Sequence, residues 1–329
     1  MSNNSGVVAK KQFLCTMNPW SDKATQFLTV LLKIVIVSGA FFVIYHKLSA
    51  DPQLSWTSFR EALQKIAHPG MIFVLFALTF SNRFLEILKW QNLGSTLRPL
   101  SLWESTKQVL AALTAGLFTP NGIGEYAGKA FYFPKKEAGQ VVFLNLICNG
   151  IQMVLTVVFG TIGLFILGYS EWAWGVIALA TAMGLLFYFT QKITLKGYSF
   201  HFLYTKIQAL PKLVHQKNNL LALGRYLIFS HQYYFLFRAF EVHLPYATLM
   251  GAIAAVYFMA SSLPSFQFLD FAVKGSVALF FFGKLGVDDW TVVFISTLMW
   301  LMNVVVPVLL GSYFILIFKP QWASTSASD

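Results

Sequence analysis

The stretch from Thr119 to Lys129 combines a helix-breaking proline, three glycines, a carboxylate and an ammonium group within a chain of long apolar runs. Nothing in a bilayer core can hydrogen-bond an exposed backbone, so a broken helix at that depth must be surrounded by protein or by a water-filled cavity. An ionisable side chain there costs about 2.5–3.5 kcal/mol on insertion scales and therefore indicates function. The stretch predicts a polar site inside a membrane domain.

The composition also points to a membrane protein. Charged residues make up 11% of the 329 residues, against about 25% in a typical soluble domain. The mean hydropathy is +0.62 and aromatic residues reach 17%, which suits lipid-facing helices and interface belts. The net charge of +11 does not indicate a nucleic-acid partner, because the basic residues cluster in short loops between apolar runs. That distribution is the orientation signal of an inner-membrane protein.

The apolar runs predict an all-α polytopic membrane protein with about six full spans. The expected spans are residues 26–46, 70–90, 141–169, 172–190, 220–241 and 290–318. Two further helical segments each run into a proline and are followed by a short helix. These pairs, 102–118 with 123–133 and 246–262 with 268–282, predict two re-entrant broken helical hairpins.

Basic residues in the loops predict the orientation. The segment 192–217 carries five lysines and no acid, so it should lie in the cytoplasm, where it would also meet anionic lipids. Residues 1–24 and 319–329 are expected to be cytoplasmic polar tails that flank a single transmembrane domain at 25–318. We therefore expect an integral protein of the bacterial inner (plasma) membrane with both termini in the cytoplasm.

The two broken segments share one plan, and their halves lie at about 70–169 and 219–318. The shared elements are Arg83/Glu86, Pro120 and Glu125/Lys129 in the first half, and Arg238/Glu241, Pro264 and Asp270/Lys274 in the second. The first segment should dip in from the cytoplasm and the second from the opposite face. Equal motifs that enter from opposite faces predict an inverted-topology repeat, whose substrate site lies near the midplane.

The first motif suits an anionic headgroup. A helix that starts after Asn121 and Gly122 would direct free backbone N–H groups and a positive dipole end into a cavity. Gly122 and Gly124 would leave room for a headgroup near the backbone, and Lys129 adds a point charge suited to phosphate. Glu125 and Lys129 share a helix face, so they can neutralise each other when the site is empty.

Structural alternatives stand beside these roles. Acid–base pairs inside membrane helices often serve only to neutralise charge for insertion, and Asn145, Asn149 and Gln152 on one helix face are typical of interhelical hydrogen bonds. We expect substrate binding at Asn121, Gly122, Gly124, Glu125, Lys129, Asp270 and Lys274, with support from Arg83, Glu86, Pro120, Arg238, Glu241 and Pro264. The sequence contains no zinc motif, nucleophile elbow or phosphate loop, so we expect no catalytic residue, cofactor or metal.

The residues from Phe118 to Glu125, with a base at Lys129, resemble the flippase-like membrane region of the lysylphosphatidylglycerol synthases. That family typically shows a Pro-x-x-x-Gly-Glu core with a basic residue soon after. The second break after Pro264 and the Leu-Lys-Trp ending of the 70–90 run support the resemblance. It covers roughly residues 25–318 and describes a short stand-alone member without the soluble aminoacyl-transferase domain. Asp270 departs from the family, which usually has glycines and a glutamate there.

The resemblance implies lipid translocation or the handling of lipid-linked sugars. We expect a translocator for an anionic phospholipid or a polyprenyl-linked lipid, with the headgroup held in a midplane cavity between the hairpins. One alternative is a membrane-embedded glycosyl- or headgroup-transferase with Glu125 as the base. Another is a membrane subunit of a lipid-modifying complex, which would act with a separate synthase or as a homo-oligomer.

Overall fold

The computed structural model describes residues 68–117, 119, 122–190, 194–195, 198–263 and 270–318, together with Leu31, Arg60 and Gln64. Several predictions lie outside the described residues. They concern the tails at 1–24 and 319–329, the span at 26–46 apart from Leu31, and Pro120, Asn121 and Pro264. The side chain of Asp270 is also outside the described part, although a helix begins at that residue.

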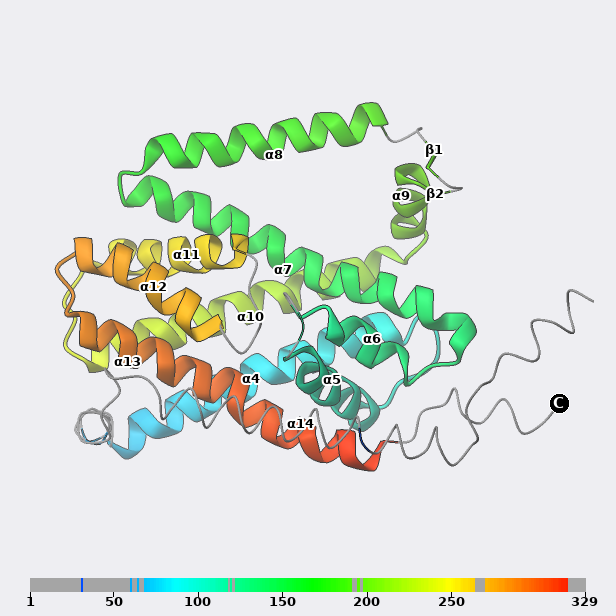
Figure 1. Cartoon of the computed structure of the whole chain (residues 1–329), viewed down its shortest axis with the longest axis horizontal. Coiled ribbons are helices and arrows are strands. Elements are labelled where there is room, and N and C mark those ends of the chain that lie inside the picture. The colour runs from blue at the N-terminus through cyan, green and yellow to red at the C-terminus, as the bar shows by residue number, and fades with distance from the viewer. Residues whose placement is uncertain are drawn as a thin grey trace, which may run out of the picture.

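The described chain is helical, as predicted (Figure 1). The helices are α4 (Pro69–Gly94), α5 (Leu102–Gly116), α6 (Gly124–Ala130), α7 (Ala138–Ile166), α8 (Ser170–Thr190), α9 (Phe200–Gln208), α10 (Lys212–Ala239), α11 (Tyr246–Ser262), α12 (Asp270–Lys284), α13 (Asp289–Trp300) and α14 (Val306–Ile317). A 3-10 turn, η1 (Lys135–Glu137), precedes α7, and a π-helical turn, η3 (Leu301–Val305), joins α13 to α14. Two short antiparallel strands, β1 (Thr194–Leu195) and β2 (Tyr198–Ser199), precede α9 and were not expected.

Four helical segments of the described chain are long and apolar enough to cross a membrane. They are Pro69–Gly94, Lys135–Ile166, Ser170–Thr190 and Asp289–Ile317, and they coincide with four of the predicted spans. The predicted span at 220–241 is also helical, as α10, but it is not among the four. The reason is its polarity, since α10 carries Asn218, Arg225 and Gln232 along its length.

Two helical hairpins lie between the long helices (Figure 1). The α5–α6 hairpin begins and ends towards the end of the molecule where α4 and α14 finish. The α11–α12 hairpin begins and ends at the opposite end, beside the α7–α8 turn. The inner ends of both hairpins therefore point towards the middle of the described bundle.

A capping box marks the outer end of the α5–α6 hairpin. The Ser101 hydroxyl accepts a hydrogen bond from the Glu104 backbone N–H at 3.1 Å, and the Glu104 carboxylate accepts one from the Ser101 N–H at 2.9 Å. The hydrogen bond to the Ser101 backbone, with the Ser101 side chain as a second cause, holds the pKa of the Glu104 carboxyl below its ordinary value. These contacts define where α5 starts.

Glycines allow the hairpins to pack closely against the long helices. A Cβ on Gly163 of α7 would come within 2.4 Å of the Gly251 carbonyl oxygen of α11. A Cβ on Gly311 of α14 would lie 2.2 Å from the Leu110 carbonyl oxygen of α5. Small residues at such crossings let helix backbones approach within a membrane. Each hairpin is thus held by a long helix at a position where no larger residue fits.

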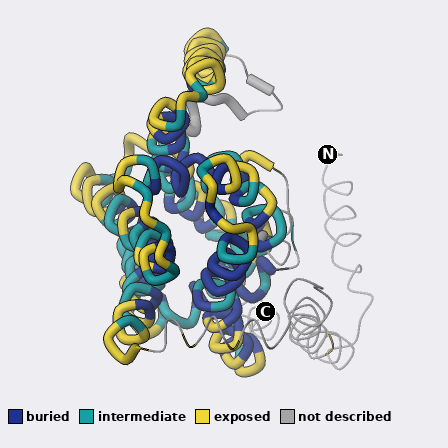
Figure 2. Tube along the Cα trace, turned by 90° about the vertical axis from the view of Figure 1, so that its left-hand side faces the viewer, coloured by how far each residue is buried: buried dark blue, intermediate teal, exposed yellow. Residues whose placement is uncertain are grey.

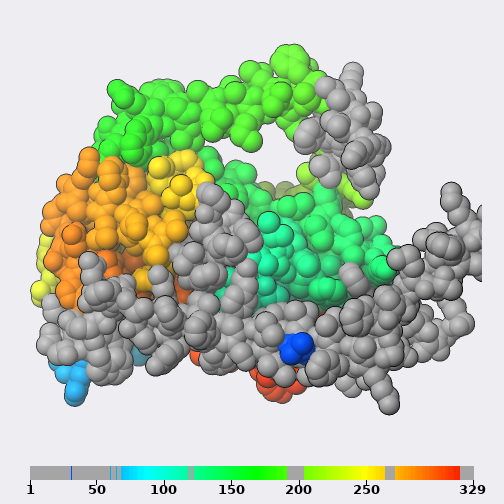
Figure 3. Space-filling view, in the orientation of Figure 1, coloured from blue at the N-terminus to red at the C-terminus, as the bar shows by residue number. Residues whose placement is uncertain are grey.

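Helix α8 stands apart from this bundle (Figure 2). Only 6% of the residues in its most apolar stretch of 18 are buried, and the Leu179 and Phe189 side chains are 63% and 73% exposed. The space-filling view shows open space between α8 and the body of the molecule (Figure 3). An apolar helix with this exposure is suited to lipid contact.

Candidate functional site

A cavity of about 390 Å³ lies where the hairpins meet α4, α7, α10 and η3. Its charged lining residues are Arg83, Glu86, Glu125, Arg225 and Lys274. Its size falls within the range of about 300–1,000 Å³ that is typical of ligand pockets. The structure therefore brings five charged side chains, four of them predicted as site residues, around one hollow.

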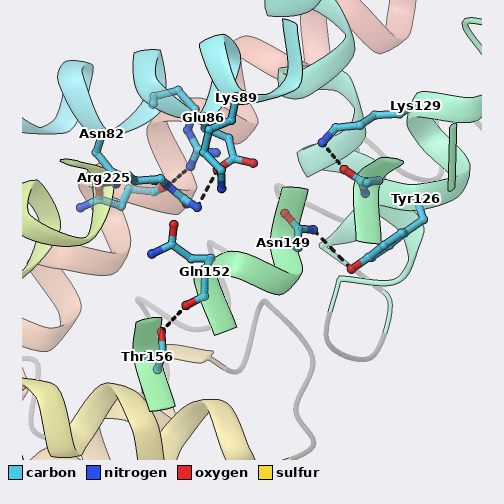
Figure 4. Close-up of polar contacts among 12 residues, drawn as sticks. Asn82, Glu86, Lys89, Tyr126, Lys129, Asn149, Gln152, Thr156 and Arg225 are labelled. Carbon is cyan, nitrogen blue, oxygen red and sulfur yellow. Dashed lines mark hydrogen bonds and ion pairs between the residues drawn. The ribbon is translucent and has the colours of Figure 1, made fainter. Parts of the chain in front are cut away.

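An ion pair between α4 and α10 forms one wall of the cavity (Figure 4). Arg225 Nη1 lies 2.6 Å from Glu86 Oε2, and Lys89 Nζ lies 3.8 Å from the same oxygen. Glu86 and Lys89 are 4% and 0% exposed. A buried charge with one partner removed is destabilising by several kcal/mol, about 3–5 in measured cases. The pair therefore fixes α10 against α4 and presents the Arg225 guanidinium to the cavity.

A network of amides extends from this ion pair to η3. Asn82 Nδ2 donates to Asn303 Oδ1 at 2.7 Å, and Arg225 Nε donates to Asn82 Oδ1 at 3.1 Å. Arg83 Nη2 donates to the Asn303 carbonyl oxygen at 2.7 Å. That carbonyl cannot receive an α-helical hydrogen bond from residue 307, because Pro307 has no N–H. The irregular turn thus supplies a backbone acceptor for a half-buried arginine.

The glycines at the break have separate roles. Gly122 has φ +69 and lines the cavity, so it supplies the left-handed turn that precedes α6. A Cβ on Gly124 would lie 2.6 Å from the Ala115 carbonyl oxygen, so Gly124 packs α6 against α5. The Gly124 N–H donates to Thr119 Oγ1 at 2.7 Å. Helix α6 has seven residues and is shorter than the predicted 123–133 helix.

Lys129 does not line the cavity and lies behind its wall. The side chain is 1% exposed, and Nζ donates to Asn145 Oδ1 at 2.6 Å. The ammonium also lies 4.7 Å from the centre of the Trp90 ring, a cation–π contact worth about 0.5–2 kcal/mol. Trp90 Nε1 in turn donates to Gln108 Oε1 at 2.7 Å. Lys129 is thus fixed by residues of α4 and α7, and Gln108 of α5 holds the Trp90 ring in turn.

Only some of the residues predicted as site residues in the second half of the chain line the cavity. Lys274 of α12 lines the cavity, and its Nζ lies 5.0 Å from the centre of the Tyr257 ring. Arg238 and Glu241 lie at the exposed end of α10, where Arg238 Nη1 donates to the Val242 carbonyl at 3.4 Å, and they do not line the cavity. Arg225 is the charged residue of α10 that lines the cavity.

Sequence reasoning missed Arg225, Asn82 and Asn303. A signal for Arg225 exists, because it is the only Lys, Arg, Asp or Glu between Lys217 and Arg238. Pro307 gives a signal for Asn303, since a proline inside a helix leaves the carbonyl four residues earlier without a donor. Nothing in the local sequence distinguishes Asn82 from an ordinary polar residue of a helix.

The three amides predicted as interhelical links on α7 differ in their roles. Asn145 holds Lys129, and Asn149 Nδ2 lies 3.4 Å from the Tyr126 hydroxyl, as a weak hydrogen bond. Gln152 lines the cavity, and both polar atoms of its side chain are buried with no hydrogen-bond partner in the structure that is described. Among the described residues no group of three or more His, Cys, Asp or Glu side chains could hold a metal ion.

A family model described as the lysylphosphatidylglycerol synthase TM region matches residues 30–267. The match covers more than half of the chain, so the protein belongs to this family, as the motif at Phe118–Glu125 predicts. No curated protein and no solved structure matches the chain. Family membership and the four apolar helices together identify an integral membrane protein from a family related to lipid handling.

Proposed function

We propose that this family member moves an anionic phospholipid or polyprenyl-linked lipid between leaflets, with the headgroup held in the central cavity. The charge of the cavity carries the proposal. Three cations and two carboxylates line it, and two more cations, Lys89 and Lys129, are buried directly behind. Five positive groups therefore stand against two negative ones. The positive charge remains in excess even when the Asp270 carboxylate is counted as a third negative group.

Such an excess favours an anion because uncompensated buried charge is costly in a low-dielectric site. Glu86 lies 2.6 Å from Arg225 and 3.8 Å from Lys89, so this one carboxylate is shared between two cations. A lipid phosphate would supply the missing negative charge. Arginine offers a rigid fork of donors that fits phosphate oxygens, and Lys274 offers a mobile point charge.

The residues divide into those that touch the headgroup and those that position them. In this proposal Arg83, Arg225 and Lys274 bind the phosphate, while Glu86 orients Arg225. Lys89 and Lys129 raise the positive potential from behind the wall. Glu125 and Asp270 hold the lysines or take up protons, and the backbone at Asn121 and Gly122 borders the headgroup.

We infer a topology that fits this function. The hairpins extend from opposite ends of the bundle (Figure 1), which supports two re-entrant pairs related as an inverted-topology repeat. Six spans, with both termini in the cytoplasm of a bacterium, then place the cavity near the midplane of the inner membrane, where transporters of this architecture hold their substrates. The basic segment at 192–217 would meet anionic lipids, and a separate synthase or a second copy remains a proposed partner.

The test is leaflet exchange by the purified full chain in liposomes that contain a fluorescent anionic phospholipid. Arg225→Gln should lower the exchange rate by about tenfold or more, because a hydrogen bond to a charged group is worth about 1.5–3 kcal/mol. Arg225→Lys, which keeps the positive charge, should retain part of the wild-type exchange rate. Lys136→Gln removes an exposed charge from η1 and should leave the rate unchanged. Thermal unfolding of each variant separates lost transport from lost folding.

If the Arg225→Gln protein is folded and its exchange rate is unchanged, the cavity does not take part in transport. A radiolabelled sugar or headgroup donor added to the same liposomes tests the transferase alternative. Formation of a labelled lipid product that requires Glu125 would replace translocation by transfer as the function.

A further inference from the structure

We infer that Gln232 of α10, which lies outside the cavity, is a positioning residue for the cavity arginine Arg225. This inference rests on the proposed function, because it names a residue that prepares the same cavity for an anionic headgroup. Gln232 is 0% exposed and does not line the cavity. A chain of side-chain amides nevertheless connects it to Arg225, which lies two turns earlier on the same face of α10.

The chain of amides starts at two acceptors on α4. Gln232 Nε2 donates to Thr79 Oγ1 at 2.7 Å and to the Leu75 carbonyl oxygen at 3.3 Å. Because a carbonyl oxygen can only accept, the amide nitrogen of Gln232 must face α4 and its amide oxygen must face η3. There Asn303 Nδ2 donates to Gln232 Oε1 at 3.0 Å. The Gln232 amide is thereby fixed at both of its polar atoms.

The same reasoning continues through Asn303 and Asn82. Asn303 Nδ2 also donates to the Met299 carbonyl oxygen at 3.1 Å, so Asn303 Oδ1 turns to the other side, where Asn82 Nδ2 donates to it at 2.7 Å. Asn82 Oδ1 then accepts from Arg225 Nε at 3.1 Å. A guanidinium can only donate. The hydrogen bonds therefore run in one direction, from the Arg225 donor to the carbonyl acceptor on α4, and any amide turned over would meet a like group.

Two contacts fix the plane of the Arg225 guanidinium (Figure 4). Glu86 Oε2 lies 2.6 Å from Nη1, and Asn82 Oδ1 holds Nε. A planar fork of donors binds two phosphate oxygens well only when it lies in their plane. The chain of amides therefore gives a defined orientation towards the cavity to an arginine that the carboxylate alone would hold at one edge.

Asn303 links this chain to the second arginine of the wall. Its backbone carbonyl oxygen accepts from Arg83 Nη2 at 2.7 Å, while its side chain belongs to the chain of amides. Thr79, Asn82 and Gln232 are 8%, 4% and 0% exposed, so water competes little for these bonds. A buried network in which each member has its partners makes the surrounding structure rigid.

The first experiment measures leaflet exchange by the full chain in liposomes with increasing mole fractions of fluorescent phosphatidylglycerol. Gln232→Met keeps the length of the side chain and removes its amide. The half-saturating mole fraction should rise by about three- to fivefold, which corresponds to one neutral hydrogen bond. The maximal rate per folded molecule should change little. The control is Gln216→Met, the same change at an exposed position of the same helix, which should alter neither quantity.

A double variant separates positioning from packing. In the Arg225→Gln background, Gln232→Met should cause no further rise in the half-saturating mole fraction, because the group that Gln232 positions is absent. An equal rise in both backgrounds would overturn the inference. A Gln232→Met protein that melts earlier and loses only maximal rate would also overturn it, since that is the result of a purely structural role.

The second experiment does not depend on transport. In the full chain with isotope-labelled arginine, in nanodiscs of phosphatidylcholine, the nuclear magnetic resonance signal of the Arg225 Nε–H is identified by its loss in Arg225→Gln. Hydrogen exchange of this group with solvent should be about three- to fivefold faster in Gln232→Met, because Asn82 holds it less firmly. Equal hydrogen-exchange rates would overturn the inference and leave translocation standing. Absence of leaflet exchange by the wild type would instead overturn the proposed function.

Discussion

The two hairpins share an acid-x-x-x-Lys motif, yet the structure places their lysines differently. Lys129 of the α5–α6 hairpin is buried against Asn145 and Trp90, behind the cavity wall. Lys274 of the α11–α12 hairpin lines the cavity itself. One motif therefore yields a lysine buried behind the cavity wall and a lysine on the wall itself.

The packing of each hairpin explains the difference. Gly124 and Gly128 bring α6 against α5, where a Cβ on Gly128 would lie 3.0 Å from the Ala112 Cα. The Thr114 hydroxyl also reaches the Val308 carbonyl of α14 at 3.2 Å. In α12, by contrast, a Cβ on Gly275 would meet nothing within 4 Å. The first hairpin is tightly fixed, whereas the described part of the second has room at this position.

The largest expected effect comes from removing the close fit of the first hairpin. Gly124→Ala would place a Cβ 2.6 Å from the Ala115 carbonyl oxygen, so we expect a loss of about 1–3 kcal/mol in the free energy of unfolding. Gly275→Ala is the matched change in the second hairpin and should stabilise α12 by about 0.5–1 kcal/mol. Unfolding of both variants in detergent measures the difference, and equal effects would contradict the proposed contrast.

The next effect concerns the lysine on the wall. Lys274→Met keeps the length of the side chain and removes its charge, so leaflet exchange of an anionic lipid should fall by about tenfold. The melting temperature should change little. A variant that melts early without losing transport per folded molecule would show that Lys274 has a structural role only.

A smaller effect on transport is expected for the lysine behind the wall. Lys129→Met should lower exchange by about two- to threefold, because its charge acts on the cavity from a distance. It should also lower stability by about 1 kcal/mol, since Asn145 loses its partner. If Lys129→Met reduces exchange more than Lys274→Met does, Lys129 rather than Lys274 is the lysine that binds the headgroup.

Much of the fold could be predicted from the sequence because lipid imposes strong rules. Apolar length identified the segments that became α4, α7, α8 and α13–α14. Helices α5 and α11 stop close to the proline breaks, as expected. The start of α10 was missed, because its first turns are too polar to be read as a span, yet the helix begins at Lys212.

The candidate site could be predicted only in part. Gly122, Glu125 and Lys274 line the cavity as expected, together with the Arg83/Glu86 pair. Arg238 and Glu241 repeat that pair in sequence but lie at an exposed helix end. Spacing shows which residues share a helix face, whereas tertiary packing determines which face turns inward. The isolated charge of Arg225 is a signal in the sequence, but only the packing of α10 against α4 shows that it lines the cavity.

The central claim is that an anionic headgroup occupies the hollow between the two hairpins. The most direct measurement is a cryo-electron microscopy structure of the full chain in nanodiscs of phosphatidylglycerol. The account predicts headgroup density within hydrogen-bond distance of Arg225 and Lys274. A structure in which lipid binds elsewhere, with Glu125 and Lys274 facing bulk solvent or acyl chains and no shared cavity, would contradict it.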